Sequence, residues 1–179
     1  SLALPVRPAA RQTYATAVDR EHRAMMVSGG EGWQPGHERS DTWALQLDGP
    51  PQWTQLQTSG SGAGPVSWHA GDYSPERGGF IHYGAIWTAA QNECFELDLA
   101  TNQWEQVLPP APDPRPMSQG GAVLVPDPAA DRPVLLGGVG RHDLWSFDES
   151  GPAWTRLATD GTTPADGIAF DAKRRRLIA

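Results

Sequence analysis

The chain has 179 residues, a formal net charge of −7, 20 Gly, 17 Pro and a single Cys. This length suits one hydrophobic core, and no apolar run approaches the roughly 18 residues of a membrane-spanning helix, so we expect a soluble chain without membrane insertion. The negative charge argues against nucleic acid as a partner, and the lone cysteine excludes a disulfide framework.

A repeat of about 50 residues organises the chain. Trp53, Trp104 and Trp154 lie 51 and 50 residues apart, and each opens a short strand-like segment. Two further markers keep the same register. Apolar runs end in Gly29 and Gly30, in Tyr83 and Gly84, and in Gly137 and Gly138; the polar residues Asp41, Asn92 and Asp143 are followed two positions later by Trp43, Cys94 and Trp145. We expect the glycines and the Trp53, Trp104 and Trp154 side chains to have structural roles.

Each unit is expected to contain four short antiparallel strands, a to d, joined by turns rich in Asp, Pro, Ser and Gly. Strand b is apolar at consecutive positions, which is typical of a strand covered on both faces. In chain order the expected strands are 14–18, 23–28, 42–47 and 53–56, then 69–73, 79–83, 93–97 and 104–107, then 122–125, 133–136, 144–147 and 154–157.

The repeat predicts the domain organisation. Residues 1–13 are expected to hold the d strand of a preceding unit and a linker, followed by complete units at 14–57, 58–107 and 108–157. Residues 158–179 repeat strands a and b of a fourth unit, at 167–171 and 174–179.

The period, the apolar strand that ends in a glycine pair, and the strand that begins with Trp together resemble the kelch repeat of kelch and galactose-oxidase-type β-propellers. The second unit departs from the pattern, with Tyr83 in place of a glycine and Cys94 in place of Trp. The resemblance implies an all-β, kelch-type β-propeller of about three and a half four-stranded blades. It also implies one of three functions: an adaptor for protein partners, a sugar-modifying enzyme such as a sialic acid mutarotase, or a copper radical oxidase.

A partial ring leaves blade faces and strand edges uncovered, which favours association. Two explanations follow: the chain is part of a longer propeller, or two copies close a ring of about seven blades as a homodimer. We favour the longer parent chain, because natural chains rarely end inside a strand.

The candidate binding residues lie in the b–c and d–a loops, which strand alternation places at one end of the sheets. Aromatic and arginine side chains gathered on loops are typical of sites for peptides, carboxylates or sugars. The b–c loops supply Trp33, Trp87, Arg141 and Arg39, and the d–a loops supply Trp68, His69 and Arg115. The alternative is that these Trp side chains cap blade edges. We expect a protein, peptide or glycan ligand.

A catalytic role is the alternative, with a sugar-modifying active site that is incomplete in this chain. Five His and three Tyr invite comparison with a copper oxidase, but no His pair has chelating spacing, and no nucleophile or phosphate-loop motif occurs in a strand-to-helix context. We therefore expect no metal and no cofactor, and favour binding over catalysis. The ligand's identity and the cellular compartment stay open.

Overall fold

The computed structural model describes residues 6–34, 37–62, 64–84, 93–108, 115–116, 121–127, 132–137, 143–158, 169–171, 173–174 and 176–178. In this part of the chain every regular element is a strand. None of its segments is a helix long and apolar enough to cross a membrane.

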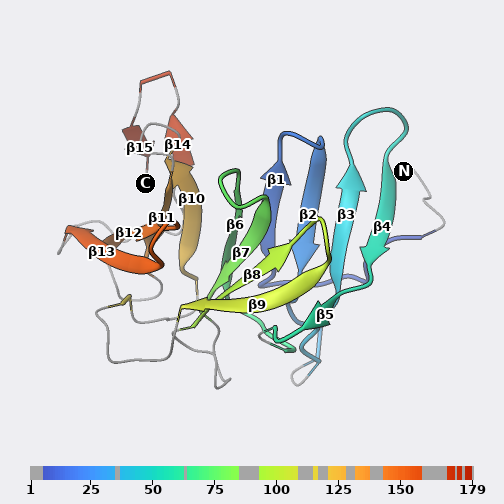
Figure 1. The fold of residues 1–179 in the computed structure, drawn as a ribbon. Helices are drawn as coiled ribbons and strands as arrows, with labels where there is room; N and C mark the ends of the chain where they lie inside the picture. The colour runs from blue at the N-terminus through green and yellow to red at the C-terminus, as the bar shows by residue number, and fades with distance from the viewer. Residues whose placement is uncertain are drawn as a thin grey trace.

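The strands form successive antiparallel sheets in chain order, as Figure 1 shows. Sheet 1 contains β1 (Ala15–Asp19), β2 (Ala24–Ser28), β3 (Thr42–Gln46) and β4 (Gln52–Leu56). Sheet 2 contains β6 (Ala70–Ser74), β7 (Gly79–Tyr83), β8 (Cys94–Asp98) and β9 (Gln103–Leu108), and sheet 3 contains β10 (Val123–Asp127), β11 (Arg132–Leu136), β12 (Leu144–Asp148) and β13 (Ala153–Ala158). A fourth sheet consists of β14 (Ala169–Asp171) and β15 (Arg176–Ile178).

The first strands of the four sheets are neighbours in space. β1 lies beside β6, β6 beside β10, and β10 beside β14, although each pair is separated by a whole sheet in sequence (Figure 1). Each of the first three sheets then extends outward through its second, third and fourth strands, and the described part of the fourth sheet through β15. This arrangement, with first strands inside and blades radiating from them, is that of a partial β-propeller, as the sequence predicts.

Apolar side chains fill the spaces between consecutive sheets. Met26 of sheet 1 packs with Phe80, Leu97 and Trp104 of sheet 2. Between sheets 2 and 3, the core includes Ile81, Tyr83, Cys94, Leu135, Phe147 and Trp154. Trp104 and Trp154 are therefore core residues, as expected, whereas Trp53 is only half-buried.

The turns between first and second strands have the same length in all four sheets, with four residues between the paired ends. Asp19 accepts hydrogen bonds from the backbone N–H groups of Glu21 and His22, and Asp171 accepts one from Arg174. In sheet 2, Ser74 has this role and accepts from the Arg77 N–H. The predicted turn-forming role of Asp19 and Asp171 is confirmed, and the equal turn lengths align the four inner strands residue by residue.

The predicted register of the second unit is wrong by one residue. The hydrogen bond from Gly29 N to Asp41 O in the first unit corresponds to Gly84 N to Glu93 O in the second and Gly137 N to Asp143 O in the third. Gly84 has a φ of 67°, and Tyr83 lies in β7 outside the left-handed region. The counterpart of the first glycine is therefore Gly84, and Tyr83 is an ordinary strand residue.

The same correction applies to the third strand. A β-bulge falls between Cys94 and Phe95 in sheet 2 and between Leu144 and Trp145 in sheet 3. Phe95, and not Cys94, is therefore the counterpart of Trp145. All three units then carry an aromatic residue at this position, and the departures that the sequence suggested disappear.

Sheet 2 has one more strand than expected. The short strand β5 (Ser59–Gly60) pairs in parallel with the start of β9, so the segment leaving sheet 1 is attached to the outer edge of sheet 2. Of the first 13 residues, 1–5 lie outside the described residues; the rest contain no strand, and Gln12 makes only an isolated bridge to Glu31.

Candidate functional site

Backbone hydrogen bonds join the loops at one end of sheets 1 and 2. The Gly30 N–H donates to Val66 O at 2.7 Å, the Arg39 N–H to Gly30 O at 2.8 Å, and the Val66 N–H to Arg39 O at 3.1 Å. The Trp68 N–H donates to Thr13 O at 2.9 Å. We call this surface, formed by the described residues of 29–41 and 57–69, the loop face. Its backbone is fixed by pairing even though little of it is regular strand.

The glycine pair that ends β2 allows these loops to approach closely. A Cβ atom on Gly29 would lie 2.7 Å from Cε1 of His69 and 2.9 Å from Val66 O, and one on Gly30 would lie 2.6 Å from Gln12 O. Both glycines have positive φ, of 62° and 88°. A side chain at either position would push the loops apart.

An ion pair between Arg11 and Asp41 holds the start of the loop face in place. The Arg11 guanidinium donates to both carboxylate oxygens of Asp41, at 2.7 and 2.8 Å, and to Gly29 O at 3.0 Å. The Trp43 indole N–H donates to the same carboxylate at 2.6 Å. Burial alone would raise the pKa of Asp41, but these hydrogen bonds together with the charges of Arg11 and Arg39 hold it below its usual range.

Two histidines lie under the loop face in a buried aromatic cluster. The rings of His69 and His82 are 4.5 Å apart between centroids, and His82 is 4.6 Å from Trp104. Burial lowers the pKa of His69 to about 4 and lowers that of His82 well below its usual value. Both rings are therefore neutral at pH 7, and His69 contributes packing under the surface rather than an exposed contact.

The structure brings several of the expected binding residues to the same end of the sheets. Trp33 is 94% exposed and Trp68 38% exposed, while Arg39 is half-buried.

Arg115, the remaining described candidate, is half-buried. It precedes Pro116, whose carbonyl accepts a hydrogen bond from the Tyr83 hydroxyl at the end of β7. Trp87 and Arg141, together with Gly138, lie outside the described residues.

A small polar recess of about 200 Å³ opens on the loop face. Its walls come from the glycine-rich segment around β5 and from the end of β2, and His82 and Trp104 line it. Among the described residues, no charged side chain lines it. The described residues hold no group of three or more His, Cys, Asp or Glu side chains that could bind a metal ion.

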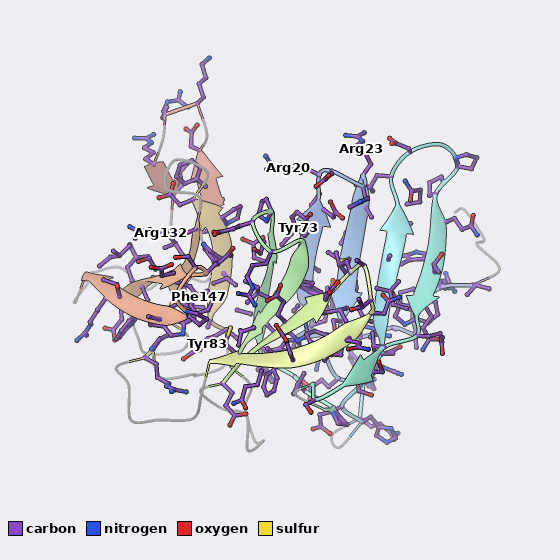
Figure 2. The ribbon with its side chains drawn as sticks, viewed as in Figure 1. Arg20, Arg23, Tyr73, Tyr83, Arg132 and Phe147 are labelled. Atoms are coloured by element: carbon purple, nitrogen blue, oxygen red, sulfur yellow. The ribbon has the colours of Figure 1, made fainter. Side chains whose placement is uncertain are left out.

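A larger cavity, which the sequence interpretation missed, lies at the opposite end of the inner strands. It has a volume of about 590 Å³ and is lined by residues of β1, β6, β10 and β14 and of the turns that follow them. We call it the axial cavity. Figure 2 labels three of its lining residues, Arg20, Tyr73 and Arg132.

No family model and no curated protein matches the sequence. Among solved structures, the chain is similar to the one described as "Structure of YjhT", with a TM-score of 0.66 and 17% sequence identity. The match covers 92% of this chain and 55% of that one, so this chain spans about half of the solved chain's length. At this identity the likeness shows the fold alone.

Proposed function

We propose that the chain is part of a kelch-type β-propeller that acts as a binding or scaffold module, and that it holds a peptide or glycan ligand on the loop face. The observation that supports this most is Trp33. An indole that is 94% exposed contributes almost nothing to the core, yet its loop is tied by backbone hydrogen bonds to the neighbouring loop.

An aromatic side chain on a backbone held by hydrogen bonds is well suited to binding, because little backbone freedom is lost when the ligand arrives. Tryptophan and arginine are also the residues most often found at the energetic centre of interfaces. Trp68 and Arg39 lie on the same loop face, and the adjacent recess presents hydroxyl and backbone groups suited to a polar ligand. The proposal concerns this face, whether the ring is completed by a longer chain or by a second copy.

The test is a glycan array and a peptide array probed with the full chain, followed by affinity measurements on the best ligand. Trp33→Ala should weaken binding by about tenfold or more, since loss of a central aromatic contact typically removes over 1 kcal/mol. Trp33→Phe should keep part of the affinity.

Leu47→Ala is the matched control. Leu47 is a 42% exposed apolar residue whose N–H bonds to Arg23 O, at the other end of sheet 1. Its substitution should leave binding unchanged. If Trp33→Ala binds as well as the unaltered chain, or if Leu47→Ala loses as much affinity, the loop face is not the binding surface.

A further inference from the structure

The axial cavity is built from equivalent positions of the four sheets. Because the first turns have equal length, Ala17, Asp72, Val125 and Ala169 share one position, and Val18, Tyr73, Pro126 and Phe170 share the next. All eight residues line the cavity. The wall is therefore two consecutive rings of side chains, and Asp72 is a carboxylate in a ring whose other members are alanine and valine.

Asp72 is buried, with 8% of its surface exposed. One of its oxygens, Oδ1, accepts a hydrogen bond from the Tyr73 N–H at 2.8 Å, whereas Oδ2 has no partner among the described residues. A buried carboxylate oxygen without a partner is unfavourable unless something binds to it.

Glu149 supplies a second carboxylate to the same cavity. It comes from the turn between β12 and β13 and is 4% exposed. Its Oε2 accepts from the Ser74 hydroxyl, while Oε1 is buried without a partner among the described residues. Its charge acts on Asp72, since burial and the Glu149 charge together raise the pKa of Asp72 to about 7. Each of the two acids that line the cavity thus keeps one buried oxygen without a partner among the described residues.

The remaining charged groups of the cavity lie nearer to solvent. Arg20, Glu21 and Arg132 are exposed, and Asp127 is half-buried. Water and salt screen exposed charges far more than buried ones. The buried charged groups of the cavity are therefore both acids. The rest of the wall is largely apolar and includes Val18, Met25, Val125, Pro133 and Phe170.

From these contacts we propose that the axial cavity binds an organic cation, an ammonium or guanidinium group on an apolar body, with the cation held by Asp72 and Glu149 and the body held by the apolar rings. A cation at this wall is attracted by both carboxylates and offsets the repulsion between them. An anion would be repelled by the two carboxylates, and a neutral apolar molecule would leave their mutual repulsion unchanged.

The test uses 2-phenylethylamine and 2-phenylethanol, which share one apolar body and differ in charge. Isothermal titration of the full chain at pH 8 should show the amine binding at least about tenfold more tightly than the alcohol, as expected for a charge-assisted hydrogen bond in a buried site. Equal binding of the two compounds, or no binding of the amine, overturns the proposal whatever the variants do.

Variants then locate the site. Asp72→Asn keeps an oxygen for the Tyr73 N–H and should lower the amine affinity by about tenfold while leaving the alcohol unaffected. Asp48→Asn, at an exposed acid that does not line the cavity, is the matched loss of one negative charge and should change the affinity by less than about twofold. Unchanged amine binding by a folded Asp72→Asn protein rejects the site.

The same titration separates two sources of the cation. A lysine peptide blocked at both ends carries the ammonium on a side chain, whereas 2-phenylethylamine is a free small molecule. Tighter binding of the peptide assigns the cavity to a protein side chain, and tighter binding of the amine assigns it to a metabolite-sized ligand. Either result with loss in Asp72→Asn supports the proposal.

Discussion

The Ser74 hydroxyl donates a hydrogen bond to Oε2 of Glu149, and this bond joins the first turn of sheet 2 to the last turn of sheet 3. The Arg77 guanidinium strengthens the junction by donating to the backbone carbonyl of Glu149 at 3.2 Å. Both Ser74 and Glu149 are buried. The two blades are therefore joined by polar contacts at the cavity end as well as by the apolar core between them.

Ser74→Ala should lower the free energy of unfolding by about 1–3 kcal/mol, because it leaves a buried carboxylate with one partner fewer. Ser146→Ala is the matched control. Its hydroxyl is also buried, with 1% of the residue exposed, but has no hydrogen-bond partner among the described residues, so its removal should be neutral or slightly stabilising. Urea unfolding of both variants tests this, and equal losses would show that the Ser74 hydroxyl does not join the blades.

Asp72 should contribute a loss of stability as the pH rises from about 4 to 7, opposite in sign to the contribution of the buried His69 and His82. Burial, with the charge of Glu149, raises the pKa of the folded Asp72 to about 7, whereas the unfolded carboxyl titrates near its ordinary value. Between these values the folded chain binds the extra proton, so deprotonation favours unfolding.

Asp72→Asn should remove the Asp72 contribution, a decrease on the order of 3 kcal/mol in the free energy of unfolding between pH 4 and pH 7. The variant should equal or exceed the unaltered chain in stability at pH 8 and gain nothing at pH 4. Burial also raises the pKa values of Glu149 and Glu96. Both residues are present in both proteins, so their effect on stability has the same sign in each. The measurement is the difference between the two urea unfolding curves as a function of pH. A constant difference would contradict the prediction.

The sequence predicts the strands well, because Trp, Gly and Asp mark the same points of every unit. The error in the second unit has a simple cause. The turn between β3 and β4 has five residues between the paired ends Gln46 and Gln52, whereas the turn between β8 and β9 has four, between Asp98 and Gln103. A fixed spacing counted back from Trp53 and Trp104 therefore selects Cys94, one residue before the correct Phe95.

The acidic position in the wall of the axial cavity can be predicted from the sequence, but only once the strand register is known. Once the first turns are aligned by Asp19, Ser74, Asp127 and Asp171, Asp72 is seen to replace an alanine or valine. The part played by Glu149 could not be predicted, because its contact with Ser74 spans 75 residues and depends on how two blades pack. The exposure of Trp33 and the burial of His69 likewise depend on how the loops fold over the sheets.

Trp104→Ala should lower the free energy of unfolding by about 3–5 kcal/mol, because the side chain fills the space between sheets 1 and 2. Trp53 has the same place in the repeat but is half-buried, so Trp53→Ala should lose only about 1–2 kcal/mol. Thermal and urea unfolding of the two variants provide the comparison. A loss for Trp104→Ala no greater than that for Trp53→Ala would mean that the indole does not hold the two blades together.

Gly29→Ala should be more destabilising than the positive φ of Gly29 alone would require. Gly49 provides the matched control, because its φ of 75° is similar to the 62° of Gly29 and no atom lies within 4 Å of a Cβ added there. Gly49→Ala should therefore report backbone strain alone, about 1–2 kcal/mol. A Cβ on Gly29 would also approach the buried His69 ring and Val66 O, which adds about 1–3 kcal/mol for overpacking. Urea unfolding measures both losses, and equal values would show that the loops of the loop face can separate freely from the end of β2.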